Sequence, residues 1–274
     1  MRQGCSTGIV EVGMATILGL VGSPRREQGF THRVVSAVLQ GAREQGAQVQ
    51  LEYLTDWGLE TCVDCGAPCF ADAICARSES VSELTRLVNA ADGLVIGAPV
   101  YIWQVNGLTH AFMDRYRRPG NAALARQPNG RPAVAVTVAG GTGTGISGAT
   151  RSLLDFLCLW GYRALEPVLV TRYNLTQALE IARVRGSDLA KAAGTPRPFK
   201  GVAELLAYYD ELQFSCSSRL DEMIWLAEQA MHLGHPNTDQ IKRLCAEAKA
   251  IRYSDPAAAT EKAVRAFELG RGPL

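Results

Sequence analysis

The sequence lacks an excess of charge of either sign. It has 28 Lys and Arg against 27 Asp and Glu, a formal net charge of +1 at pH 7, and only 20% of its residues are charged. Recognition of nucleic acid or of an acidic membrane surface depends on a field of one sign, so this balance argues against both partners. Since 47% of the 274 residues are hydrophobic, the chain can bury a large core. We expect a globular protein whose partners are small molecules.

The sequence also lacks the long apolar runs that mark export or membrane insertion. Residues 1–13 contain no run suited to a signal peptide, and no later segment reaches the apolar length of a membrane span. We therefore predict a cytoplasmic protein in which residues 1–14 form an N-terminal extension. In that compartment the eight cysteines are expected to be thiols or metal ligands rather than disulfides.

Motifs of several common catalytic classes are missing as well. None of the four histidines pairs with another at metal-ligand spacing, and no nucleophile triad is recognisable. The glycine-rich segment 139–145 does not end in Gly-Lys-Ser/Thr, so it is not the phosphate loop of a nucleoside-triphosphatase. The sequence therefore identifies no catalytic acid, base or nucleophile.

Between residues 15 and 172, short apolar runs alternate with stretches of helical periodicity. The runs at residues 16–21, 49–54, 94–98, 133–138 and 164–170 predict five strands. Helices are predicted between them, and Ser80 with Glu83 suggests a capping box at the start of the second helix. Strands that alternate with helices indicate an α/β fold with a parallel sheet covered on both faces.

Beyond residue 172 only helical periodicity is recognisable. Apolar residues recur at helical spacing in segments 202–209, 220–231 and 241–248. Amphipathic helices this short are marginal alone, so their apolar stripes must be covered by the sheet domain or by a second subunit. We therefore divide the chain into a sheet domain at residues 15–172 and a helical extension at residues 173–274, which serves as a lid or in oligomerisation.

Three loops that follow predicted strands have the composition of a ligand site. Ligands of a doubly wound sheet bind outside the carboxyl ends of the strands, where these loops should meet. The first loop, residues 22–31, offers hydroxyls, backbone N–H groups and a helix N-terminus to a phosphate. Its candidate residues are Ser23, Arg25, Gly29 and Thr31. The alternative is that this loop only forms a turn and caps the helix.

The second and third loops suit a flat polar ring system. The second combines aromatic faces with amide groups, and its candidate residues are Pro99, Val100, Tyr101, Ile102, Trp103, Gln104 and Asn106. The third loop is glycine-rich, which lets backbone approach a ligand closely, and its candidates are Gly140, Gly141 and Thr142. The alternative for Tyr101 and Trp103 is that they pack under the helical extension.

Four cysteines lie close together in a loop that we place at residues 57–79. They are Cys62, Cys65, Cys69 and Cys75. Thiolates are soft ligands that suit an iron-sulfur cluster or zinc, and neighbouring thiolates can converge on one metal centre. Zinc sites more often arrange their ligands as two separated pairs. Three interpretations stay open: an iron-sulfur cluster, a structural zinc ion, and reduced cysteines without a metal.

Together these features resemble the NADPH-dependent FMN reductase superfamily. The resemblance rests on Gly22-Ser23-Pro24-Arg25 with Thr31, on Ala98-Pro99-Val100-Tyr101 followed by Gly107 and by Ala111-Phe112-Met113-Asp114-Arg115, and on the glycine-rich loop. The spacing of the four cysteines resembles the compact motif of the iron-sulfur flavoproteins in that superfamily. The similarity covers about residues 15–171. The spacing between Cys65 and Cys69, the aromatic residues Phe30 and Trp103 and the long helical extension depart from the family pattern.

The resemblance implies a flavodoxin-like doubly wound five-stranded parallel sheet of order 2-1-3-4-5 with FMN at the three loops. It also implies a 4Fe-4S cluster held by the four cysteines, and homo-oligomers (dimers or tetramers) that bring one subunit's cluster near another's flavin. We therefore expect an FMN-dependent oxidoreductase that couples flavin to the cluster, for electron transfer or for reduction of a small-molecule substrate. NAD(P)H is a possible reductant, and a ferredoxin-like protein is a possible electron partner. The alternatives are an NAD(P)H-dependent quinone or nitroaromatic reductase without a cluster, and a flavodoxin-like electron carrier.

Overall fold

A computed structural model describes residues 14–66, 69–118, 130–212, 214–232 and 234–271. Apart from Met14, the N-terminal extension predicted at residues 1–14 lies outside the described residues, as does Cys5. Within the described part of the chain, no helix is both long and apolar enough to cross a membrane.

A parallel sheet forms the centre of the molecule. Its main path has the order β2-β1-β3-β5-β6, built from β1 (Thr16–Val21), β2 (Gln48–Tyr53), β3 (Gly93–Tyr101), β5 (Pro132–Ala139) and β6 (Arg163–Ala164). Every residue of β5 is buried because both faces of the sheet are covered, which is typical of parallel sheets. In the register, Ile96 of β3 lies between Leu20 of β1 and Ala135 of β5.

The sheet confirms the predicted strand order, but the described residues form seven strands instead of five. The predicted strand at residues 164–170 is interrupted, and its second part, β7 (Val168–Thr171), pairs with β5 separately from β6. Pro167 lies in the interruption and has no N–H to donate to a strand neighbour. The other additional strand is β4 (Gln104–Val105), which pairs antiparallel with β3 and makes a hairpin.

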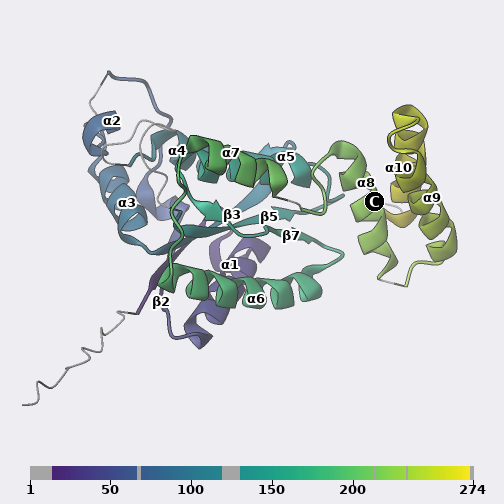
Figure 1. The fold of residues 1–274 in the computed structure, drawn as a ribbon, viewed down its shortest axis with the longest axis horizontal. Coiled ribbons are helices and arrows are strands. Elements are labelled where there is room, and N and C mark those ends of the chain that lie inside the picture. The colour runs from purple at the N-terminus through teal and green to yellow at the C-terminus, as the bar shows by residue number, and fades with distance from the viewer. Residues whose placement is uncertain (1–13, 67–68, 119–129, 213, 233, 272–274) are drawn as a thin grey trace, which may run out of the picture.

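Helices cover both faces of the sheet (Figure 1). One face carries α1 (Phe30–Glu44) and α6 (Leu175–Gly194), and a core of mainly small and β-branched side chains lies beneath them. The opposite face carries α3 (Glu79–Ala90), α4 (Gly107–Arg115), α5 (Ile146–Leu159) and α7 (Val202–Glu211), above a second core that also includes residues of the C-terminal helices. The short helices η1 (Arg26–Gln28), η2 (Leu54–Trp57) and α2 (Cys69–Asp72) lie in the loops.

The predicted helical character of the C-terminal region is confirmed, while the division of the chain at residue 172 stays a prediction. After α7, the helices α8 (Arg219–Met231), α9 (Thr238–Ile251) and α10 (Pro256–Arg271) pack on one another at one end of the molecule (Figure 1). The capping box predicted from Ser80 is wrong. Helix α3 begins at Glu79, so its N-cap is Ser78, whose hydroxyl accepts from the N–H of Val81 at 3.3 Å. Ser80 lies inside the first turn and donates to the Trp57 carbonyl at 2.9 Å.

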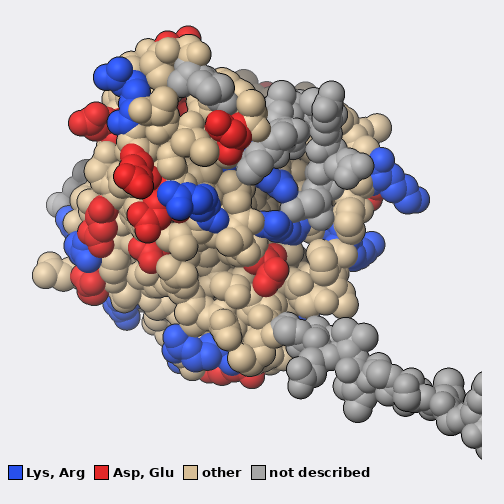
Figure 2. Space-filling model, turned by 90° about the vertical axis from the view of Figure 1, so that its left-hand side faces the viewer, with Lys and Arg blue, Asp and Glu red and all other residues tan. Residues whose placement is uncertain are grey.

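Charged side chains of both signs are interspersed on the face in Figure 2, which belongs to the end of the molecule that carries α2 and α3. This mixture agrees with the nearly equal numbers of basic and acidic residues. The described part of this face therefore has no broad field of one sign.

Helices α1 and α6 touch through two glycines. A Cβ on Gly41 would lie 1.9 Å from the Arg183 carbonyl oxygen, and a Cβ on Gly186 would lie 1.9 Å from the Val38 carbonyl oxygen. Both distances are far below van der Waals contact, and the obstructing atoms are backbone. The helices can approach this closely only because neither position has a side chain.

We predict that Gly186→Ala lowers the free energy of unfolding, by about 2 kcal/mol, because the helices must separate to admit the methyl group. Urea unfolding followed by circular dichroism measures this change. Gly194→Ala is the matched control, since Gly194 belongs to the same helix and a Cβ there meets no atom within 4 Å. Equal midpoints for the two variants would contradict the proposed contact.

Candidate functional site

One cavity, of about 390 Å³, lies at the carboxyl ends of β1, β3 and β5. Residues from all three predicted loops line it: Ser23, Arg25, Gly29, Thr31, Pro99, Val100, Tyr101, Gly140 and Gly141. The cavity is also lined by Gln28, Phe30, Val138 and Arg172, which are not among the predicted site residues. Loops that are distant in the sequence therefore meet at one site, as the rule for doubly wound sheets requires.

The end of this cavity beside α1 suits an anion. Helix α1 begins after Gly29, and no side chain caps its first turn, so the backbone N–H groups there remain available to a ligand. Ser23 is buried, and its hydroxyl accepts from the N–H of Arg25 at 3.2 Å. That acceptor role leaves the hydroxyl proton of Ser23 able to donate to a bound group.

Arg26 does not line the cavity, although it lies between the lining residues Arg25 and Gln28 in the sequence. Its guanidinium donates to Thr55 at 3.1 Å, pairs with Asp56 and lies 4.3 Å over the Tyr53 ring. Its hydrogen bond holds the pKa of the exposed Asp56 carboxyl below the usual range. The two cationic side chains that line the cavity are Arg25 and Arg172. Arg172 comes directly after β7, so the strand-end rule could have identified it.

The other end of the cavity is bounded by the hairpin of β3 and β4. Tyr101 pairs with Gln104, and the two residues of the turn between them both have positive φ, 48° at Ile102 and 63° at Trp103. Such turns normally contain Asn and Gly, and positive φ is especially unfavourable for a β-branched residue. Tyr101 lines the cavity, whereas Ile102 is 96% exposed.

Trp103 turns toward the helices instead of the cavity. Its Cα lies 2.5 Å from the position that a Cβ on Gly145 would occupy, and the Arg219 guanidinium of α8 lies 4.6 Å over its ring. Trp103 therefore contacts the helical extension, as its alternative interpretation expects. The contacts with Gly145 and Arg219 help to hold the strained turn in place.

Five predicted residues do not line the cavity: Ile102, Trp103, Gln104, Asn106 and Thr142. Asn106 is buried and links the first loop to the start of α4. Its amide donates to the Gly22 carbonyl at 2.8 Å, and its side-chain carbonyl oxygen accepts from Thr109 at 2.6 Å. The hydroxyl of Thr142 bonds that of Thr144 at 2.8 Å, and Gln104 lines a separate groove between α4 and α5. Direct contact of these five residues with a cofactor stays a prediction.

The four clustered cysteines line a second cavity, of about 130 Å³. All four are free thiols; Cys62 and Cys65 are exposed, while Cys69 and Cys75 are half-buried. Four thiols facing one cavity are a donor set that suits an iron-sulfur cluster. Within the described residues, however, no three His, Cys, Asp or Glu side chains lie close enough together to hold a metal ion. That criterion concerns a single metal ion, whereas the chemistry of the ligand set fits a cluster.

Arg115 ties Cys75 to the end of α4. Its guanidinium donates to the Cys75 sulfur at 3.2 Å and to the Glu60 carbonyl at 3.1 Å. Burial alone would raise the pKa of the Cys75 thiol, but the hydrogen bond and charge of Arg115, with backbone hydrogen bonds, bring that pKa below its ordinary value. Arg117 lines the same cavity and lies 4.3 Å over the Phe70 ring. The surroundings of Cys75 therefore stabilise its thiolate form more than water does.

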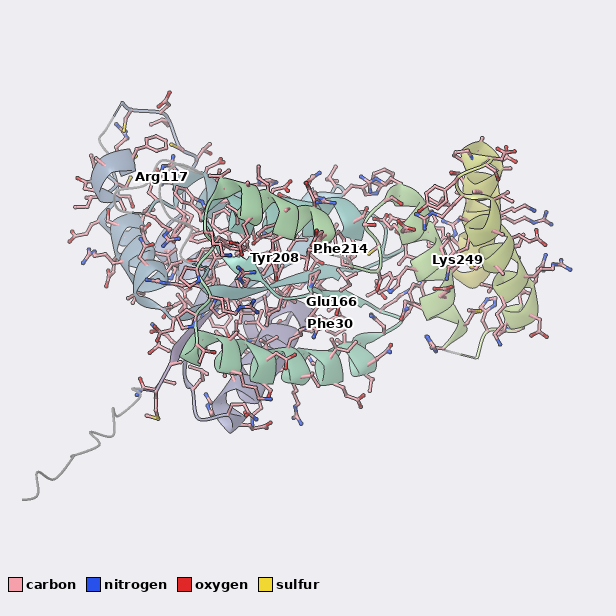
Figure 3. The ribbon with its side chains drawn as sticks, viewed as in Figure 1. Phe30, Arg117, Glu166, Tyr208, Phe214 and Lys249 are labelled. Carbon is pink, nitrogen blue, oxygen red and sulfur yellow. The ribbon has the colours of Figure 1, made fainter. Side chains whose placement is uncertain are left out.

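The two cavities lie in different parts of the molecule. Helix α4 begins at Gly107, just after the hairpin, and ends at Arg115 in the cysteine cavity, so its length of roughly 13 Å separates them. Figure 3 shows the same separation through Phe30, which lines the first cavity, and Arg117, which lines the second.

The chain matches the family model described as NADPH-dependent FMN reductase over residues 15–171. The chain belongs to this family. Within the NADPH-dependent FMN reductase family, the curated relatives place it on the iron-sulfur flavoprotein branch. An iron-sulfur flavoprotein of Methanocaldococcus jannaschii is 32% identical over 52% of this chain and 71% of its own length. One from Methanosarcina thermophila is 27% identical over 53% and 74%. The protein is thus a flavin-dependent oxidoreductase.

The strand order β2-β1-β3-β5-β6 makes the fold of this FMN reductase family member flavodoxin-like, and solved structures share this fold. An NAD(P)H:quinone oxidoreductase from Methanothermobacter marburgensis has a TM-score of 0.51 at 20% identity and covers 64% of this chain and 97% of its own. RosB has a TM-score of 0.53 at 15% identity over 75% and 93%. At these identities the similarity concerns the fold alone.

We predict that Ile102→Asn raises the free energy of unfolding, by roughly 1 kcal/mol, because Asn tolerates positive φ and the exposed Ile102 side chain loses little packing. Thermal unfolding measures the change. Ile102→Val is the control, since it keeps the β-branch and should give no gain. A variant Ile102→Asn no more stable than Ile102→Val would show that the turn is not strained.

Proposed function

We propose that this oxidoreductase binds FMN in the cavity at the strand ends and a 4Fe-4S cluster through Cys62, Cys65, Cys69 and Cys75. It would use the two groups together to reduce a small molecule or an electron-carrying protein. The observation that carries the proposal is the meeting of three separate loops around one cavity with an uncapped helix N-terminus at one end and an aromatic hairpin at the other.

The residues around this cavity suggest how FMN would lie. The first turn of α1, with Ser23, Thr31 and Arg25, would bind the phosphate, since backbone N–H groups, hydroxyls and a cation complement a dianion. Tyr101 and Pro99 would cover the ring system. The glycines at 140 and 141 would let backbone donors come near the ring edge.

When bound, FMN accepts electrons in pairs and releases them singly, and a neighbouring cluster carries single electrons. The residues of this chain supply position and environment. In the second cavity, Arg115 would donate to the Cys75 ligand, and N–H···S bonds of this kind help to set the reduction potential of a cluster. Arg117 and Phe70 would cover one side of the cluster from solvent.

A second copy of the chain would bring the two sites close together. Within one chain the length of α4 separates the cavities, so a cluster of one subunit could serve the flavin of another. We propose a homo-oligomer as the working form because the similarity to iron-sulfur flavoproteins implies one. The electron donor would be NAD(P)H or a ferredoxin-like protein.

One observation favours a second candidate, an NAD(P)H-dependent quinone or nitroaromatic reductase without a cluster. The fold is shared with an NAD(P)H:quinone oxidoreductase from Methanothermobacter marburgensis, which this chain matches over 97% of that protein's length. In that case the flavin site would be the same and the cysteine loop would have no redox role. Cofactor analysis separates the two candidates.

The proposal predicts that Ser23→Ala weakens FMN binding about tenfold, because a hydrogen bond to a charged phosphate contributes about 1.5 kcal/mol or more. Quenching of flavin fluorescence on titration of the apoprotein measures the dissociation constant. Ser36→Ala is the matched control, because Ser36 lies on α1 but lines a different groove. Equal affinities for the two variants would place the phosphate elsewhere.

If the four cysteines hold a 4Fe-4S cluster, anaerobically purified protein should contain iron and acid-labile sulfide in equal amounts, in addition to FMN. Cys62→Ser and Cys75→Ser should each lose most of the iron and sulfide while keeping FMN, because the two cavities are separate. Cys158→Ser, on α5, is the control and should keep all three components. Wild-type protein with FMN but neither iron nor sulfide would favour the reductase without a cluster.

A further inference from the structure

Helix α8 belongs to the C-terminal extension, yet it contacts the loops of the flavin cavity. Three of its residues, Arg219, Glu222 and Leu226, are spaced so that they share one face of the helix. Each of the three meets a different part of the loops around the cavity. The contacts cover the N-terminus of α5, the tip of the β3–β4 hairpin and the middle of the glycine-rich loop.

Glu222 caps α5 from another helix. Its carboxylate is 1% exposed and accepts from the N–H groups of Gly145 at 2.7 Å and Ser147 at 2.8 Å, and from the Ser147 hydroxyl. Gly145, the N-cap residue of α5, has φ of 89° and no side chain to serve as a cap. A buried carboxylate is stable here because backbone donors and the helix dipole compensate its charge. Glu222 therefore fixes the point where the glycine-rich loop enters α5.

Arg219 and Leu226 contact two other segments of the site, the hairpin and the glycine-rich loop. The Arg219 guanidinium lies 4.6 Å over the Trp103 ring and 3.6 Å from the Glu222 carboxylate. Leu226 is fully buried against the loop, where a Cβ on Gly143 would lie 2.6 Å from its Cδ2. The hairpin tip and the glycine-rich loop are thus held by one helix face.

We propose that α8 is a positioning element of the flavin site, in which Glu222, Arg219 and Leu226 fix the glycine-rich loop and the hairpin in the shape that receives the ring system. The inference rests on the proposed FMN site. None of the three residues lines the cavity, whereas Gly140, Gly141 and Tyr101 of the held segments do. Loss of the α8 contacts should therefore lower the affinity for FMN without removing a group that touches FMN.

The test compares FMN dissociation constants and release rates for Glu222→Gln, Arg219→Gln and Glu228→Gln in the full-length protein. We expect affinity to fall about tenfold in Glu222→Gln, which loses charge-assisted hydrogen bonds to buried donors, and about threefold in Arg219→Gln. Glu228→Gln is the control on the same helix, because Glu228 pairs with Lys249 of α9 (labelled in Figure 3) and should bind FMN as the wild type does.

The unfolding midpoint of each apoprotein separates positioning from simple stabilisation. A purely structural cap would lower that midpoint in Glu222→Gln but leave FMN affinity, measured well below the midpoint, unchanged; that result would overturn the proposal. If Glu222→Gln does not fold, Arg219→Gln decides, since its side chain is 51% exposed and not part of the core. Wild-type affinity in Arg219→Gln would then overturn it. Wild-type protein that binds no FMN would overturn the proposed function and this inference together.

Discussion

Parallel pairing of β1, β3 and β5 is the constraint on which the rest of the structure depends. It directs the carboxyl end of each strand to the same edge of the sheet, so three loops that are distant in the sequence surround one cavity. It also requires cover on both faces, because a parallel sheet has no side suited to water. The helices that supply this cover then determine which further side chains reach the cavity and the cysteine loop.

The strands and the three loops were predictable because they rest on strong local signals, whereas the strand order was implied by the family resemblance. Apolar runs ended by glycine and proline mark the strands, and the strand-end rule brings the loops together. Helix α6 was not predicted, because the residues it buries are mostly alanines such as Ala178 and Ala182, which give a weak periodic signal. The N-cap at Ser78 could not be separated from Ser80 by sequence, because the two serines lie on either side of the first helical residue and both can cap a helix.

The candidate site was predictable where a residue acts locally and not where it acts at long range. Ser23, Gly29 and Thr31 line the cavity because they belong to the loop between β1 and α1 and to the first turn of α1. Trp103 lies in a loop whose composition suits a flat ring system, so it was predicted to bind the ring. The side chain that lies over Trp103 is instead that of Arg219, more than a hundred residues later in the sequence. No local pattern links Glu222 to the N-terminus of α5 either. From the sequence, a carboxylate on a distant amphipathic helix is expected to face solvent, but in the structure Glu222 is buried.

The glycine contact between α1 and α6 has a consequence for the smallest fragment of this chain that can stand alone. The family match stops at residue 171, before α6 begins. A fragment that ends there would expose to solvent the face of α1 that packs on α6, including Val38 and Ala42, together with the strand residues beneath it. Any shortened version intended for crystallisation or screening should therefore retain α6 through Gly194, together with α7 and α8, which cover the opposite face of the sheet and cap α5.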